Sequence, residues 1–149
     1  MSHRILIVDD SAIIRHSLRN CIEQNTQWEV CGEAENGQIA IQKVKDLCPD
    51  VVILDWQMPV MNGLEAAREI TAIAPATTLL MITMHESGDL AQQAYAAGIK
   101  EVLSKTDGVV EHLIASLGNA WASTLGPAPL LGGGTLPASS PKTARPVKT

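Results

Sequence analysis

Short apolar runs bounded by turn residues alternate along the chain with longer stretches whose apolar residues recur at helical spacing. This alternation predicts a strand followed by a helix, five times in succession. The predicted strands are Arg4 to Val8, Trp28 to Ala34, Val51 to Leu54, Thr78 to Ile82 and Glu101 to Leu103. The predicted helices lie near Ser11 to Gln24, Gln38 to Leu47, Gly63 to Ala74, Ser87 to Ala97 and Val109 to Thr124.

Three of the predicted strands are almost continuously apolar, which is typical of central parallel strands covered by helices on both faces. Parallel strands joined by helical crossovers are right-handed in nearly all proteins, so the pattern predicts an α/β fold with a doubly wound (βα)5 sheet. In such a sheet, ligands bind beyond the carboxyl ends of the strands.

The last 24 residues, 126–149, differ from the rest: nine of them are Pro or Gly, and the segment has no apolar periodicity. Such a segment cannot bury enough surface to fold alone. We therefore expect one domain over residues 1–125 and a flexible tail or linker over 126–149. A short strand or docked peptide around Leu130 and Leu131 is the alternative.

Composition and charge exclude several classes of protein. The 149 residues are 46% apolar and carry a net charge of −5, and the tail holds three basic residues and no acid, so the predicted domain is more acidic still. No lysine or arginine cluster is present in residues 1–125, which argues against direct nucleic-acid binding by this domain. The apolar runs are too short for a membrane span or a signal peptide, so we expect a cytoplasmic protein. Three cysteines without CxxC spacing indicate buried thiols rather than disulfides or a metal site.

Chemistry-bearing residues follow the predicted strands at their carboxyl ends: Asp9, Asp10, Asp55, Thr83 and Lys105. Each alone has an ordinary explanation, such as a helix cap, a strand-end hydroxyl or a surface charge. Together they converge on one rim, where each close pair of carboxylates would repel by about 4 kcal/mol at an effective dielectric near 20. Oxygen ligands on an open rim suit Mg²⁺. A carboxylate beside a metal ion, an ammonium and a hydroxyl is suited to accept a phosphoryl group.

The motifs that carry these residues resemble the receiver domains of bacterial two-component response regulators. The resemblance spans residues 3 to about 122 and rests on LIVDDS at 6–11, NG at 36–37, VILDWQMPVMNG at 52–63, MIT at 81–83 and AGIKEVLSK at 97–105. It implies a flavodoxin-like sheet with strand order 2-1-3-4-5.

The resemblance also implies roles for single residues. Asp55 would be the phospho-acceptor, and Asp10, Asp55 and the main-chain carbonyl of Gln57 would bind Mg²⁺, with Asp9 assisting through water. Thr83 and Lys105 would hold the phosphate oxygens. The implied partners are a sensor histidine kinase or phosphotransfer protein, an unidentified downstream protein, and a second copy of the chain in a phosphorylation-dependent homodimer.

Several positions depart from the commonest pattern of that family. Val102 stands where a Tyr or Phe usually reports activation by moving inward, and Thr106 stands where a cis proline is common. Met84 follows Thr83 where a small residue is frequent, so it could narrow access to Asp55. Gln57 and His85 occupy positions thought to tune hydrolysis of the acyl phosphate.

Other functions remain as alternatives to a phosphorylation switch. The residues SKTDGVVEHLIASL at 104–117 look like those of receivers that precede a LuxR-type DNA-binding domain, so the chain could be a receiver cut from such a regulator. An aspartyl-phosphate phosphohydrolase would use Asp55 as nucleophile, but such enzymes normally carry an acid where this chain has Gln57. A flavin or nucleotide binder would need a phosphate-cradling first loop, whereas this loop begins with Asp9 and Asp10.

Overall fold

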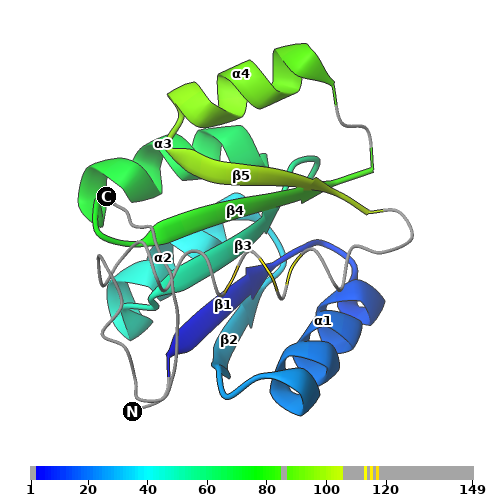
Figure 1. Ribbon diagram of the computed structural model, residues 1–149. Helices are drawn as coiled ribbons and strands as arrows, with labels where there is room; N and C mark the ends of the chain where they lie inside the picture. Colours follow the sequence, from blue (N-terminus) through cyan, green and yellow to red (C-terminus); the bar gives the residue numbers. More distant parts are fainter. Residues whose placement is uncertain (1–2, 85–86, 106–112, 114, 116, 118–149) are drawn as a thin grey trace, which may run out of the picture. The chain divides into compact units, whose positions relative to one another are not determined.

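The computed structural model describes residues 3–84, 87–105, 113, 115 and 117 (Figure 1). These residues include five strands: β1 (Arg4–Val8), β2 (Glu29–Ala34), β3 (Val51–Asp55), β4 (Thr78–Thr83) and β5 (Ile99–Ser104). Four helices follow the first four strands: α1 (Ala12–Asn25), α2 (Gly37–Leu47), α3 (Gly63–Ile73) and α4 (Gly88–Ala96). Apart from residues 115 and 117, all of these residues belong to a unit that spans Met1–Ile114.

The strands form a single parallel sheet in the order β2-β1-β3-β4-β5. The doubly wound α/β fold and the strand order expected from the sequence are therefore confirmed. In this order β1 lies between β2 and β3 (Figure 1). From β1 the chain adds β2 on one side, and it then crosses to add β3 and the later strands on the other side. The loops after β1 and β3 therefore meet at a topological switch point.

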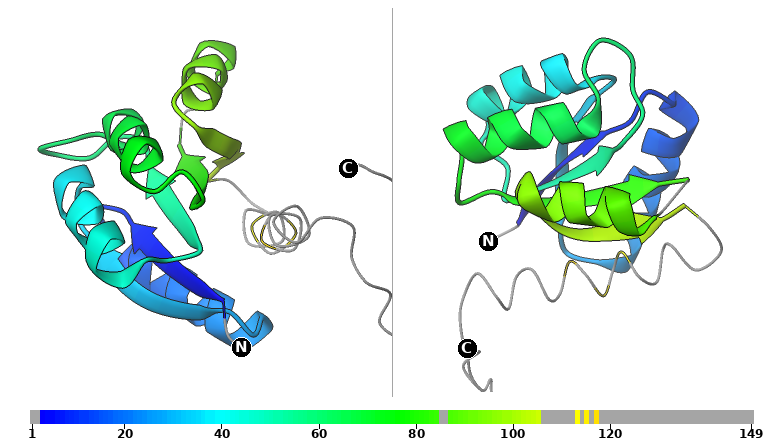
Figure 2. Two further views of the ribbon diagram at one scale, coloured as in Figure 1. Left: turned by 90° about the vertical axis from the view of Figure 1, so that its left-hand side faces the viewer. Right: turned by 90° about the horizontal axis from the view of Figure 1, so that it is seen from above.

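Helices cover both faces of the sheet, which explains why the central strands are almost entirely apolar between their ends. All five residues of β3 are buried, as are the last four of β1. One face packs against apolar residues of α2, α3 and α4, including Val44, Ile70 and Leu90. Helix α1 lies on the opposite side of the sheet from α2 and α3 (Figure 2).

Each described helix begins at a side chain that accepts a hydrogen bond from its first turn. Ser11, Asn36, Asn62 and Ser87 fill this role for α1, α2, α3 and α4. At α3 the Glu65 side chain also accepts from the Asn62 main chain, which completes a capping box. These caps fix the starting points of the helices, and so the lengths of the loops that carry the acidic residues.

Some boundaries differ from those predicted. Strand β5 begins at Ile99, two residues before the predicted start, because Ile99 pairs with Leu79 ahead of an irregularity in the register. Strands β3 and β4 each extend one residue further, to Asp55 and Thr83. Of the predicted helix Val109 to Thr124, the structure describes only residues 113, 115 and 117, and all three are helical. The tail predicted over 126–149 lies outside the described residues.

The cysteines agree with the sequence analysis in one respect and differ in another. All three are free, as expected, but none is fully buried: Cys21 and Cys31 are half-buried and Cys48 is exposed. Cys48 caps the C-terminus of α2 in the left-handed backbone conformation (φ 49°), a position at the helix surface. Among the described residues, none of the helices combines the length and the apolar content that crossing a bilayer requires.

Candidate functional site

Three carboxylates meet at the carboxyl ends of the central strands. Asp9 and Asp10 follow β1, and Asp55 is the last residue of β3. One oxygen from each of the three lies within 4.8 Å of the others. Because β1 and β3 pair directly, with Val8 opposite Leu54, the residues that follow them are neighbours. The structure thus brings together the three acids that the sequence placed on one rim.

Lys105 binds two of these acids from the end of β5. Its Nζ atom lies 2.7 Å from Asp9 Oδ2 and 3.2 Å from Asp55 Oδ1, and its side chain is only 11% exposed. Burial alone would lower the pKa of Lys105, but the hydrogen bonds and charges of Asp9 and Asp55 outweigh burial and raise it. Lys105 is therefore a fixed positive charge in contact with both carboxylates.

The Asp55 carboxyl group is buried, and its ionisation is disfavoured. Burial, followed by the negative charge of Asp9, raises the pKa of Asp55 from 3.8 to about 6, although Lys105 opposes the rise. The side chain is only 9% exposed. One ammonium group therefore does not compensate three carboxylates, and the rim favours a further cation or the loss of one negative charge.

The two acids after β1 are held differently. The Asp9 carboxylate accepts from the Ser11 main-chain nitrogen at 2.8 Å as well as from Lys105. The Asp9 main-chain nitrogen donates to the Ala34 oxygen at the end of β2, at 3.0 Å. Asp10 is exposed, and within the described part of the chain its carboxylate has no hydrogen-bond or ion-pair partner. Asp9 is thus a fixed element of the rim, and Asp10 faces solvent.

The remaining predicted residues lie around this group of acids. Thr83 is buried at the end of β4, and its main-chain oxygen accepts from the Lys105 main-chain nitrogen at 2.7 Å. Gln57 is exposed in the loop two residues after Asp55, and Met84 is 60% exposed. Val102 is 7% exposed and belongs to the apolar core, so the position where the family often has a mobile aromatic ring is filled by a small buried side chain. His85 and Thr106 lie outside the described residues.

The loop after β3 is shaped by a glycine that no other residue could replace without rearrangement. A Cβ atom on Gly63 would lie 2.2 Å from the main-chain oxygen of Asp55, and the Gly63 nitrogen donates to the Trp56 oxygen at 2.7 Å. In the same loop Val60 has a positive φ of 70°, and the Met61 nitrogen donates to the Pro59 oxygen at 2.7 Å. This tight turn is strained for a β-branched residue.

Sequence reasoning missed a charged network on α1 and β2 beside the rim. Arg15 donates to the main-chain oxygen of Asp9 at 2.5 Å and to Glu33 at 2.9 Å, and Arg19 donates to the second oxygen of Glu33 at 2.8 Å. Burial would raise the pKa of Glu33, but the hydrogen bonds from Arg19 and Arg15 lower it. The sequence shows two arginines one turn apart on a predicted helix, but nothing in it indicates that they share one acid of the neighbouring strand.

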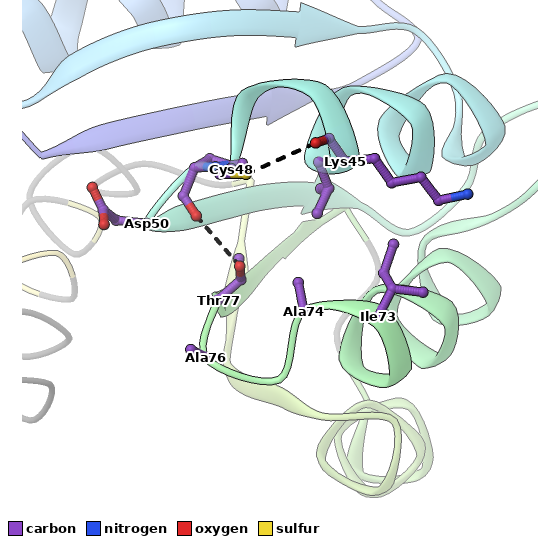
Figure 3. Close-up of a pocket in the computed structure, with 9 residues that line it drawn as sticks. Lys45, Cys48, Asp50, Ile73, Ala74, Ala76 and Thr77 are labelled. Carbon is purple, nitrogen blue, oxygen red and sulfur yellow. Dashed lines mark hydrogen bonds between the residues drawn. The ribbon is translucent and has the colours of Figure 1, made fainter.

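A separate cavity lies at the other end of the sheet (Figure 3). It has a volume of about 460 Å³ and is lined by the C-terminal ends of α2 and α3 and by the loops that lead from them into β3 and β4, with Cys48, Asp50, Ile73 and Thr77 among the lining residues. The strands point their amino ends toward it, so it is distinct from the acid rim.

Comparison with known proteins decides the family. The family model described as the response regulator receiver domain matches residues 5–116. The chain belongs to the response regulator receiver domain family. The resemblance drawn from the acid, threonine and lysine motifs is thus confirmed, and receiver domains generally act in signalling rather than as enzymes.

The relatives of this receiver domain differ in how much of their own length the match covers. The chemotaxis protein CheY of Thermotoga maritima is 39% identical over 105 residues, which are 70% of this chain and 87% of that protein. A protein-glutamate methylesterase/protein-glutamine glutaminase of Bacillus licheniformis is 36% identical over 72% of this chain, but the match covers only 30% of that protein. The similarity to the methylesterase is therefore confined to under a third of its length.

Solved structures give the same fold. A two-component response regulator of the LuxR family from Aurantimonas sp. aligns with a TM-score of 0.76 and 30% identity, over 82% of this chain and 87% of that chain. This LuxR-family response regulator therefore shares the fold of the present chain.

Proposed function

We propose that this receiver domain accepts a phosphoryl group on Asp55 in a reaction that requires Mg²⁺, and that the modification switches a contact with another protein. The observation that carries the proposal is the group of three carboxylates within 4.8 Å, two of them bound by Lys105. Membership of the receiver family supports it.

The donor set fits a magnesium ion. Asp10, Asp55 and the main-chain carbonyl of Gln57 would hold the ion, with Asp9 assisting through water. These groups offer only oxygen atoms, and Asp10 opens the site to solvent, which suits an ion that keeps several of its waters. When bound, Mg²⁺ would neutralise carboxylate charge and draw phosphate oxygens toward the rim.

The chain's own residues would carry out the transfer. A carboxylate oxygen of Asp55 forms a bond to phosphorus while the bond between phosphorus and the donor atom breaks, and the electron pair of that bond leaves with the donor. The donor is a phosphohistidine imidazole of a sensor kinase or phosphotransfer protein, or a small acyl phosphate. Lys105, already 3.2 Å from Asp55, and the Thr83 hydroxyl would bind the oxygens of the new phosphoryl group.

The output of the switch is a protein contact. The charge added at Asp55 would draw Thr83 and Lys105 inward and shift the loops after β4 and β5 together with α4, which is the general form of a local electrostatic switch. Val102 is stiff and already buried, so we expect loop movement rather than a ring rotation to carry the change. The surface formed by α4 and β5 would bind a downstream protein or a second copy of the chain.

The likeness to LuxR-family structures supports a second candidate, a receiver that controls an attached DNA-binding domain. Both candidates share the same chemistry at Asp55 and differ only in what the switch controls. We place the receiver in residues 1–125 and the Pro/Gly-rich tail, 126–149, outside it.

Phosphoryl acceptance is tested by intact-mass spectrometry after incubation with acetyl phosphate. We expect the mass of one phosphoryl group to appear with Mg²⁺ and to be absent with a chelator or in Asp55→Asn. The matched control is Asp46→Asn, which changes an exposed acid on α2 and should be modified like the wild type. Modification of Asp55→Asn to the wild-type extent would overturn the assignment.

A further inference from the structure

Arg15 joins the acid rim to the neighbouring strand through one guanidinium group. Its NH1 nitrogen donates to the main-chain oxygen of Asp9 at 2.5 Å, and its Nε donates to Glu33 Oε1 at 2.9 Å. The side chain is 17% exposed. Because a guanidinium is planar and presents its donors in a rigid fork, a group bound at both ends has little freedom to move.

Glu33 is a firm anchor for this group. The main-chain oxygen of Glu33 accepts a hydrogen bond from Lys43 Nζ. The second carboxylate oxygen of Glu33, which Arg15 does not contact, accepts from Arg19 Nε at 2.8 Å. Glu33 also lies within β2, opposite Ile7 of β1. The contacts therefore run without interruption from the paired strands through Glu33 and Arg15 to the Asp9 carbonyl.

The Asp9 carbonyl matters because it shares a planar peptide group with the Asp10 nitrogen. The Asp9 carboxylate has its own partners, Ser11 and Lys105, and does not depend on Arg15. Asp10, in contrast, is exposed and has no side-chain partner among the described residues. Its orientation is therefore set by the main chain, and Arg15 holds the peptide that leads into it.

We propose that Arg15, anchored by Glu33, is a positioning residue that orients the Asp9–Asp10 peptide so that Asp10 can bind a divalent cation. The inference rests on the proposed function, because that function requires Mg²⁺ at this rim. Arg15 itself touches no cation ligand atom and takes no part in phosphoryl transfer.

Charge and geometry predict opposite results when Arg15 is replaced, which makes the proposal testable. Removing a positive charge beside three carboxylates would by itself strengthen the binding of Mg²⁺. Losing the orientation of the Asp10 peptide would weaken it. Partners that orient metal ligands commonly contribute about 10-fold or more to metal affinity, so we expect Arg15→Gln to weaken Mg²⁺ binding by about that factor.

The experiment is a titration of the ¹⁵N-labelled full chain with MgCl₂. The readout is the change in the NMR amide signals of residues 9–11 and 55–57, from which the affinity is obtained. The matched control is Arg19→Gln, which removes the same charge one turn further along α1 and, although it takes one partner from Glu33, leaves both hydrogen bonds of Arg15 in place. It should bind Mg²⁺ as tightly as the wild type or slightly more tightly. Arg15→Lys keeps the charge but replaces the planar guanidinium, in which a separate nitrogen holds each partner, by a single ammonium nitrogen, so we expect its affinity to fall as in Arg15→Gln.

A readout without metal separates positioning from affinity. In the metal-free chain, the Ser11 amide, which donates to Asp9, should exchange its hydrogen several-fold faster in Arg15→Gln and at the wild-type rate in Arg19→Gln. Dispersed spectra establish that each variant is folded, and Arg15→Lys carries the test if Arg15→Gln is not.

The outcomes are distinct. Wild-type or tighter Mg²⁺ binding by Arg15→Gln would overturn the positioning role, and full affinity in Arg15→Lys would overturn the anchoring by Glu33. If the wild type itself shows no Mg²⁺-dependent shifts at residues 9–11 and 55–57, the proposed function fails instead.

Discussion

Replacement of Asp55 by Asn should stabilise the receiver domain when no metal ion is present. The rise in the pKa of Asp55 from 3.8 to about 6 makes its ionisation in the folded protein less favourable by about 3 kcal/mol. Asparagine has the same shape and no charge, and Lys105 keeps its 2.7 Å contact with Asp9. Because the amide still loses its hydration on burial, we expect a net gain of about 1 to 3 kcal/mol at pH 7.5.

The pH dependence of this gain follows from the direction of the pKa change. Between about pH 4 and pH 6, folded Asp55 binds a proton that the unfolded chain has released, so the stability of the metal-free wild type falls as the pH rises through this window. Asp55→Asn lacks this loss. The difference between the two proteins should therefore be small near pH 4 and reach its full size above pH 6.

The assay is thermal or urea unfolding of wild type and Asp55→Asn in a chelator, at several values of pH from 4.5 to 7.5. Each kcal/mol corresponds to about 3 to 6 °C in the melting temperature of a domain of this size. Asp46→Asn serves as the control and should show no such pH-dependent gain. Addition of Mg²⁺ should narrow the difference, because the wild type gains binding energy that the variant has lost. A variant less stable than the wild type at pH 7.5, or a difference that does not change with pH, would refute the reasoning.

Three further predictions concern the surroundings of the rim. Gly63→Ala should destabilise the domain by about 1 to 3 kcal/mol in urea unfolding, because its Cβ would lie 2.2 Å from the Asp55 main-chain oxygen. The control is Gly88→Ala, which should be neutral or stabilising because no atom lies within 4 Å of its Cβ. Val60→Gly should raise the unfolding free energy by about 0.5 to 1 kcal/mol by relieving the positive φ, and a loss of stability would show that the exposed valine is not strained. Glu33→Gln should lower the unfolding free energy at pH 7, because the charged carboxylate is bound by two guanidinium groups that lower its pKa. The difference from the wild type should shrink as the pH falls below about 4, where Glu33 becomes protonated.

The fold followed from the sequence because its signals agree at several levels. The apolar runs around Ile5 to Val8 and Val51 to Leu54 lie where the buried strands β1 and β3 are found. The predicted start of β5 was two residues too late because Lys100 separates Ile99 from the rest of the strand pattern, whereas the structure places Ile99 in the sheet through its pairing with Leu79. Pairing between distant segments decided that boundary, and no local pattern reports it.

The site followed from the sequence only as far as strand ends determine it. The acids after β1 and β3 had to be neighbours once these strands paired, so their convergence was predictable. The shared anchoring of Glu33 by Arg15 and Arg19 was not, because it depends on which way long side chains turn between α1 and β2. The strained turn at Val60 was also unpredictable, since valine gives no signal of a positive φ.

The central claim is that Asp55 is the residue that becomes phosphorylated. Reduction of an acyl phosphate with borohydride converts the modified aspartate into homoserine, which marks the site permanently for peptide mass spectrometry. After incubation with acetyl phosphate and Mg²⁺, we expect homoserine at position 55 and unchanged Asp9 and Asp10, and no homoserine when Mg²⁺ is withheld. Homoserine at position 9 or 10, or none anywhere in the chain, would contradict the account.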